Sequence, residues 1–126
     1  MSLHIAVIED DLPIAQMYRF KLEADGFKVS VAHDGKQGLL LAEDIKPDLI
    51  LLDLMMPVMT GSEMLEKLRQ TKGGSKIRVI VLTNVSKNEA PHNLRFLNVD
   101  RYIVKAHYTP QQVIDVVREV LNIPQK

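Results

Sequence analysis

The sequence predicts an α/β domain in which a doubly wound, five-stranded parallel sheet carries helices on both faces. Short apolar runs alternate along the chain with segments whose apolar residues recur at helical spacing. The run from Leu49 to Leu52 contains no polar residue, which is typical of a central strand that is buried on both faces. Asp53 follows this run directly, at the end of a strand where α/β proteins place their chemistry.

Composition indicates an ordinary globular domain. The chain has 126 residues, and we expect a single domain over residues 1–126 with no output domain. Lys and Arg number 16, and so do Asp and Glu, so no net charge favours nucleic acid or an anionic membrane. The sequence shows no membrane-length apolar run, no leader pattern and no cysteine. We therefore expect a cytoplasmic protein.

The N-terminal third predicts two strands around one helix. Residues 3–8 are mostly apolar and predict the first strand. Pro13 and Gly26 bracket an apolar-periodic segment that predicts the first helix. Residues 28–32 alternate between polar and apolar, so they predict a strand nearer the edge of the sheet.

Capping patterns predict the helices on either side of the central strand. Asp34 begins an acidic variant of the capping box and opens a Leu-rich helix that runs to about Ile45, before Pro47. Thr60 and Glu63 form a capping box for the third helix.

The C-terminal part predicts two more strands and two more helices. Residues 77–82 are apolar and largely β-branched, and residues 102–104 form a short fifth strand. Residues 86–89 form another capping box and predict a fourth helix, although Pro91 lowers its propensity. Residues 109–112 cap the last helix, which has a continuous apolar stripe.

Polar residues follow four of the predicted strands: Asp10 and Asp11, Asp53, Thr83, and Lys105. Parallel strands share their carboxyl ends, so these side chains should meet at one edge of the sheet. A pair of carboxylates about 4 Å apart costs roughly 4 kcal/mol at an effective dielectric near 20. A hard cation such as Mg²⁺ relieves that repulsion and also takes phosphate oxygens as ligands. The cluster is therefore complementary to a phosphoryl group, with one carboxylate left to act as nucleophile.

Each of these residues also has an ordinary explanation. Asp10 and Asp11 suit the start of a helix, Thr83 suits a strand, and Lys105 suits a solvated surface. Asp53 itself can start a turn or cap a helix. The coincidence of all of them at successive strand ends favours the functional interpretation.

The chain resembles a bacterial two-component response-regulator receiver domain over essentially its whole length. The motifs that carry the resemblance are residues 9–11, residues 53–61, Thr83 and Lys105. The family implies a flavodoxin-like sheet of order 2-1-3-4-5, with the site between the first and third strands. It also implies a protein that changes its affinity for a partner when phosphorylated, and that is not an enzyme in the usual sense although it assists its own phosphorylation and dephosphorylation.

The resemblance implies a role for each matching residue. Asp53 resembles the phosphoacceptor, which takes its phosphoryl group from a histidine kinase or phosphotransfer protein. Asp10 and Asp11 resemble the Mg²⁺-binding acids, with the backbone carbonyl of Met55 as a further ligand. Lys105 resembles the lysine that pairs with the phosphoryl oxygens, and the family's switch pair corresponds to Thr83 and Tyr102.

Two positions depart from the family pattern. A proline usually follows the lysine, often after a cis peptide bond, and here Ala106 takes that place. A cis bond before a residue other than proline costs several times more, which makes the backbone conformation there an open point. Asn84 stands where the family usually has a small residue, so it can narrow access to Asp53, alter the kinetics, or donate a hydrogen bond.

Three other functions compete with a receiver. A phosphohydrolase that forms an aspartyl-phosphate usually has a second acid two residues after its nucleophile, but Met55 stands there. A flavin or nucleotide module needs a phosphate loop after the first strand, where this chain has acids. A degenerate receiver that only binds is disfavoured because the acids, the threonine and the lysine are all present. The four histidines have no metal-ligand spacing.

We expect the chain to pass on its signal through a surface that another protein binds. The surface joins the helix predicted after Ser86, the strand at Tyr102 and the last helix. The partner is a downstream protein or a second copy of the chain, and neither nucleic acid nor a membrane is expected.

Overall fold

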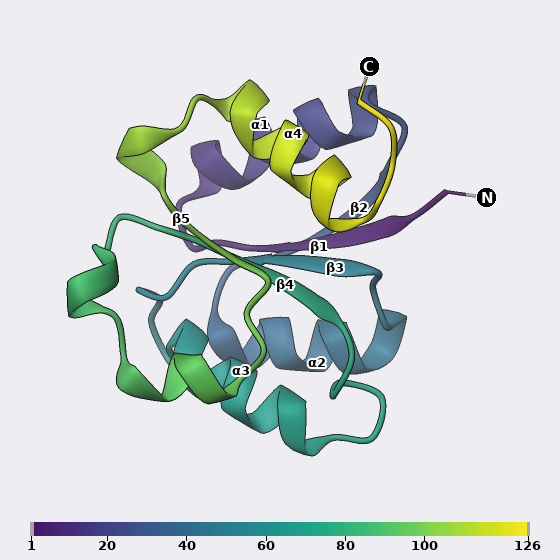
Figure 1. Cartoon of the computed structure of the whole chain (residues 1–126). Coiled ribbons are helices and arrows are strands. Elements are labelled where there is room, and N and C mark those ends of the chain that lie inside the picture. The colour runs from purple at the N-terminus through teal and green to yellow at the C-terminus, as the bar shows by residue number, and fades with distance from the viewer. Residues whose placement is uncertain (1, 126) are drawn as a thin grey trace.

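The computed structural model describes residues 2–125, which form one five-stranded parallel sheet (Figure 1). Its strands are β1 (His4–Ile8), β2 (Lys28–Ala32), β3 (Leu49–Leu52), β4 (Arg78–Thr83) and β5 (Arg101–Val104). They lie in the order β2-β1-β3-β4-β5, so the predicted topology is confirmed. All four residues of β3 are buried, and β2 is an edge strand, both as the sequence predicts.

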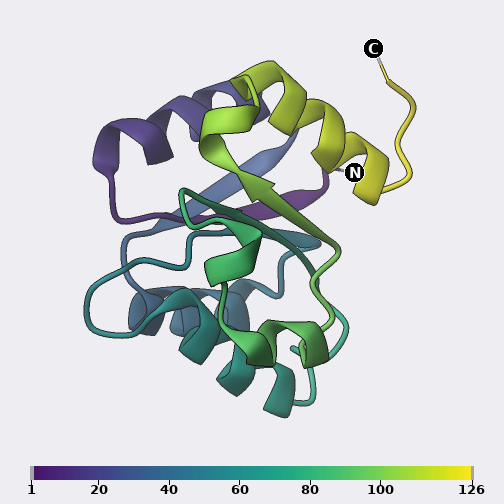
Figure 2. The same cartoon turned by 60° about the vertical axis from the view of Figure 1, so that its left-hand side comes forward.

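Helices cover both faces of the sheet. Helices α1 (Leu12–Ala24) and α4 (Pro110–Val120) lie on one face, and α2 (Gly35–Ile45) and α3 (Gly61–Gln70) on the other (Figures 1 and 2). Each strand sends alternate side chains into the two layers between sheet and helices. In β1, Ile5 and Val7 pack on the α1 and α4 side, while Ala6 and Ile8 pack on the α2 and α3 side.

Four side chains cap the helix starts. Asp11 accepts a hydrogen bond from the Ile14 amide, and Asp34 accepts one from the Gln37 amide. Thr60 and Thr109 each form a complete capping box, as their sequence patterns predict. Such caps satisfy amide groups that have no partner within the helix, so they fix where each helix begins. None of the described helices combines the length and apolar character that a membrane crossing requires.

The helix predicted after Ser86 does not form, and that prediction was wrong. Two short 3₁₀ helices, Lys87–Glu89 and His92–Phe96, occupy its place between β4 and β5 (Figure 2). Ala90 is extended, with φ −66° and ψ 147°, because the ring of Pro91 disfavours a helical residue before it. The Ser86 hydroxyl donates to the Glu89 carboxylate and makes no cap. The described chain therefore has four α-helices, and the last of them is α4.

Candidate metal and phosphoryl site

The carboxyl ends of β1 and β3 place two acids next to each other. Ile8 pairs with Leu52 in the sheet, so Glu9 and Asp53 are the first residues beyond two paired strand ends. The Asp53 amide donates to the Ile8 carbonyl at 3.0 Å, and the Glu9 amide donates to the Ala32 carbonyl at 3.0 Å. Their backbones are therefore held by the sheet itself, which is a rigid support for a site.

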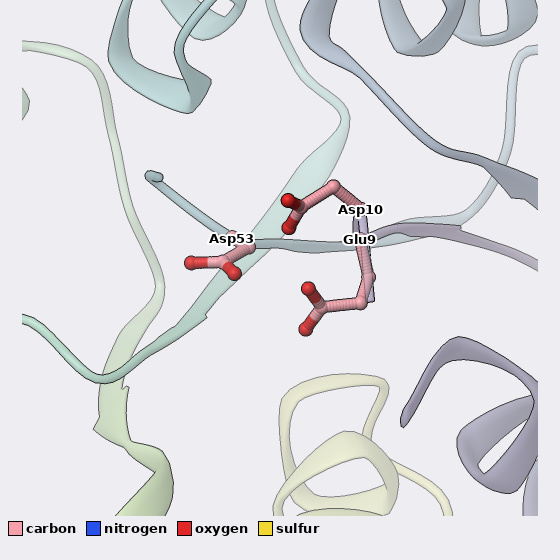
Figure 3. A group of neighbouring side chains, drawn as sticks. All are labelled: Glu9, Asp10 and Asp53. Carbon is pink, nitrogen blue, oxygen red and sulfur yellow. The ribbon is translucent and has the colours of Figure 1, made fainter. Parts of the chain in front are cut away.

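Three carboxylates converge at this edge. Glu9, Asp10 and Asp53 each offer an oxygen within 4.8 Å of the other two. Figure 3 shows the side chains of Glu9 and Asp10 reaching from the end of β1 toward the Asp53 carboxylate. Glu9 and Asp53 are buried, with 4% and 7% of their surface exposed, while Asp10 is open to solvent. Oxygen ligands of this kind suit a hard divalent cation.

Lys105 closes the cluster from the end of β5. Its ammonium group pairs with the Glu9 carboxylate and lies 3.2 Å from Asp53 Oδ2. Burial acts to lower the pKa of Lys105, but its hydrogen bond to Glu9 and the charges of Asp53 and Glu9 outweigh burial and raise the pKa. Lys105 is therefore a permanent positive charge beside the Asp53 carboxylate.

The pKa of Glu9 is raised, chiefly because its side chain is buried. Burial raises its pKa from 4.5 to about 7, and the nearby charge of Asp53 adds to this effect. Lys105 acts in the opposite direction, through its hydrogen bond and its charge. At neutral pH Glu9 is thus poised between its two forms, and a bound cation would favour the ionised one.

Asp11 is not brought into this cluster. Its Oδ1 accepts a hydrogen bond from the Ile14 amide at 3.1 Å, so the side chain serves as the N-cap of α1. Glu9, to which sequence reasoning assigned no role, occupies the cluster together with Asp10. A signal for this existed in the chain: Asp11 comes directly before Leu12 and Pro13, a pattern typical of a cap followed by the first helical turn.

The predicted switch residues lie on the neighbouring strands. Thr83 is fully buried at the end of β4, and its hydroxyl accepts a hydrogen bond from the Val85 amide at 3.3 Å. Tyr102 in β5 is half-buried, and its hydroxyl donates to the Val85 carbonyl at 2.6 Å. Both side chains thus contact the backbone of the same residue, Val85. Asn84, between them in the loop, is exposed.

The loop after Asp53 is held close to the site. The Met55 amide donates to Asp53 Oδ1 at 3.3 Å, which places the backbone of Met55 beside this carboxylate. Gly61 begins α3 so near the loop that a Cβ on it would lie 2.1 Å from the Asp53 carbonyl oxygen. The close approach therefore requires glycine at this position.

The chain after Lys105 tolerates the missing proline without a cis bond. All described peptide bonds are trans, including the one before Ala106. Residues Lys105–His107 form a single 3₁₀ turn, and His107 is exposed. The open point at Ala106 is thereby resolved in favour of an ordinary backbone.

Comparisons with known proteins agree with this geometry. Residues 5–118 match the family model of the response regulator receiver domain. The chain is 34% identical, over 85% of its length, to the phosphate regulon transcriptional regulatory protein PhoB of Rhizobium meliloti, and 33% identical, over 97%, to the alkaline phosphatase synthesis transcriptional regulatory protein PhoP of Bacillus subtilis. It covers 47% and 50% of these two proteins, so it spans about half the length of these relatives.

A solved structure shows the same fold. The chemotaxis response regulator CheY4 of Vibrio cholerae superposes with a TM-score of 0.86 at 25% identity, with 95% of this chain and 99% of that chain covered. The matched residues 5–118 include β1 from Ile5 onward, all of β2 to β5, and the acids Glu9 and Asp10 that follow β1. The chain belongs to the receiver-domain family of two-component response regulators.

Proposed function

We propose that Asp53 accepts a phosphoryl group and that this chain is a phosphorylation-dependent switch. The observation that carries the proposal is the grouping of Glu9, Asp10 and Asp53 at one sheet edge, with Lys105 bound to two of them. Such a site combines a nucleophilic carboxylate, a fixed positive charge and oxygen ligands for a cation. A structural ion pair alone would not need the third carboxylate.

Mg²⁺ is the cation that the donor set favours. Asp10, Asp53 and Glu9 would hold it, directly or through water, with the Met55 carbonyl as the further ligand that the family implies. The bound ion would neutralise charge on the phosphoryl oxygens. Asp11 has no part in this proposal, because its carboxylate caps α1.

In the transfer step, an Asp53 carboxylate oxygen attacks phosphorus and forms an acyl phosphate, while the bond from phosphorus to the donor breaks. With a phosphohistidine donor the electron pair of the P–N bond returns to the imidazole nitrogen. Lys105 is placed to pair with a phosphoryl oxygen, since its ammonium group already lies 3.2 Å from Asp53. The Thr83 hydroxyl can donate to another oxygen once it turns from the Val85 amide. These residues assist the chain's own phosphorylation and dephosphorylation.

These contacts link phosphorylation of Asp53 to the surface that a partner binds. A phosphoryl group adds roughly 1.5 to 2 negative charges and new acceptor oxygens, by analogy with phosphoserine. Thr83 and Lys105 interact with it only in the phosphorylated state, which is the differential contact that a population shift requires. Thr83 and Tyr102 both contact Val85, so movement of Thr83 reaches the segment between β4 and β5. The surface formed by this segment, β5 and α4 then changes its affinity for a partner.

In this proposal the phosphoryl donor is a histidine kinase or phosphotransfer protein. The partner that recognises the phosphorylated chain is a downstream protein or a second copy of the chain. The two relatives described above are named as transcriptional regulators. For residues 1–126 we expect no nucleic acid or membrane binding, because the net charge is zero, and we expect a cytoplasmic location. Salt-sensitive binding of this chain to duplex DNA would contradict that expectation.

Mass spectrometry tests the chemistry. Wild-type protein incubated with Mg²⁺ and acetyl phosphate should gain one phosphoryl group, and Asp53→Asn should gain none. Asp48→Asn is the matched control, because Asp48 is an exposed acid at the opposite end of β3, and it should be labelled like the wild type. Equal labelling of Asp53→Asn and the wild type would refute the assignment of Asp53.

A further inference from the structure

A small cavity lies beneath the phosphoryl site, on the face of the sheet that α1 and α4 cover. Its volume is about 10 Å³, and its polar lining residues are Glu9, Tyr18 and Asp53. Alternate residues of a strand point to the same face, so Glu9 follows Val7, which packs on the α1 and α4 side. Figure 3 shows the Glu9 carboxylate below the strand ends and the Asp10 carboxylate above them. The cavity therefore joins the buried side of the site to the helix layer.

Tyr18 reaches this cavity from α1 and brings a hydroxyl group to it. Only 5% of the Tyr18 surface is exposed. Within residues 2–125 its hydroxyl has no hydrogen-bond partner, although the oxygen is not completely sealed. Burial raises the pKa of Tyr18, while the charge of Lys105 lowers it and that of Glu9 raises it, so both charges act on the hydroxyl. An aromatic ring alone would fill this part of the core, so packing does not account for the hydroxyl.

The Glu9 carboxylate has both of its oxygens engaged in this state. Oε1 accepts a hydrogen bond from the Lys105 ammonium group, and Oε2 accepts one from the Asp11 amide at 3.2 Å. In the transfer proposed above, Lys105 pairs with a phosphoryl oxygen, so its bond to Glu9 weakens or breaks. A buried carboxylate that loses a charged partner is costly unless another donor takes its place. Glu9 is only 4% exposed, so bulk water does not supply that donor.

We infer that Tyr18 is a positioning residue of the phosphoryl site: its hydroxyl donates to Glu9, directly or through one water in the cavity, when Lys105 turns to the phosphoryl group. A cavity of this size has room for about one water molecule. The new hydrogen bond forms only in the phosphorylated state, so it favours that state over the unphosphorylated one. The inference rests on the proposed function for the movement of Lys105.

Tyr18→Phe tests the inference, because it keeps the ring and removes the hydroxyl. In EDTA its urea unfolding midpoint should equal that of the wild type, since the hydroxyl has no partner in that state. With Mg²⁺ present, its affinity for beryllofluoride, measured by fluorine NMR, should be roughly tenfold weaker, the factor expected for one hydrogen bond to a charged group. The matched control is Tyr108→Phe, which removes a hydroxyl outside the cavity and should bind beryllofluoride like the wild type.

The Tyr18 hydroxyl proton gives a second readout that a packing role would not change. Carbon NMR of the Tyr18 ζ-carbon in mixed light and heavy water reports how fast this proton exchanges with solvent. Exchange should slow when beryllofluoride is added to the wild-type protein, because the hydroxyl then donates a hydrogen bond. An unchanged exchange rate in the beryllofluoride-bound protein would overturn the inference.

Equal beryllofluoride affinity in Tyr18→Phe and the wild type would also overturn it and would leave the proposed function standing. A Tyr18→Phe protein that is destabilised in EDTA by as much as its beryllofluoride binding is weakened would show that the hydroxyl supports folding instead. Acetyl phosphate labelling separates these results from a failure of the proposed function. A wild-type protein that is not labelled at Asp53 would refute the phosphoryl switch and this inference together.

Discussion

Glu9 shows how position in a fold changes the chemistry of one side chain. Glu9 directly follows a buried strand, and its side chain is itself buried. Burial raises the pKa of Glu9 to about 7. Lys105 compensates part of that burial through an ion pair. At the residue scale, the site is thus a set of buried charges that are balanced against each other and that favour an added cation.

The raised pKa of Glu9 predicts that the free energy of unfolding depends on pH. Folded Glu9 keeps its proton up to about pH 7, whereas unfolded Glu9 loses it near pH 4.5, so the folded state binds more protons in that interval. Stability should therefore fall as pH rises through the interval, and Glu9→Gln should remove this fall. In Mg²⁺-free buffer we expect Glu9→Gln to be more stable than the wild type at pH 8 by on the order of 3 kcal/mol, and nearly equal at pH 4.

Urea unfolding in EDTA at pH 4, 6 and 8 measures the difference. Glu43→Gln is the control, because it removes an exposed carboxylate on α2 and should leave the pH profile unchanged. Parallel profiles for the wild type and Glu9→Gln would show that burial of Glu9 has no such effect.

Asp10 and Asp11 are neighbours with different roles. Removing the cap in Asp11→Ala should cost about 1 kcal/mol of unfolding free energy, while Mg²⁺ affinity stays within twofold of the wild type, roughly the scatter of such titrations. Asp11→Asn should retain the cap and the stability. Asp10→Asn should weaken Mg²⁺ binding without loss of stability in EDTA, since it relieves repulsion between carboxylates. A stable Asp11→Ala protein with weakened Mg²⁺ binding would instead make Asp11 a metal ligand.

The segment between β4 and β5 is the element with the least regular structure. Its two 3₁₀ helices comprise three and five residues, and its buried anchors are Leu94 and Leu97. Arg69 holds the end of the segment, since its guanidinium group donates to the carbonyls of Leu97 and Asn98 at 2.8 and 3.0 Å. Movement is therefore expected between Asn84 and Phe96, and the end near Leu97 acts as the fixed point.

Tyr102 should limit this movement. Tyr102→Phe removes the hydrogen bond to the Val85 carbonyl, and one such bond contributes about 1 kcal/mol. We expect amide exchange in residues 84–90 to become roughly fivefold faster, because that free energy corresponds to such a factor. Exchange in β1 is the internal control. An unchanged rate in residues 84–90 would show that the tyrosine hydroxyl does not hold the loop.

At the scale of the whole molecule, the sequence predicted the sheet and failed where local signals compete. Strands β1 to β5 and the caps at Thr60 and Thr109 were predictable, because apolar runs and capping boxes are strong local patterns. The segment after Ser86 carries a capping box and a proline five residues later, and the proline prevails. Pattern alone does not decide between such opposed signals.

The acids after β1 show a second limit. Three consecutive carboxylates, residues 9–11, follow the strand, and spacing alone does not tell which of them face the site. The answer depends on the register of β1 against β3, in which Ile8 pairs with Leu52, and on the start of α1 at Leu12. The ion pair between Glu9 and Lys105 joins residues 96 positions apart and follows only from the folded sheet.

Amide exchange with and without beryllofluoride, in the presence of Mg²⁺, tests most directly whether the phosphoryl site is coupled to the output surface. Beryllofluoride bound at Asp53 mimics the phosphoryl group, so exchange should change in residues 84–104. It should stay the same in α2 and in the buried strands β1 and β3 outside the site, because these form the fixed frame. Identical exchange in residues 84–104 in the two states, with beryllofluoride shown by mass spectrometry to be bound, would contradict the coupling.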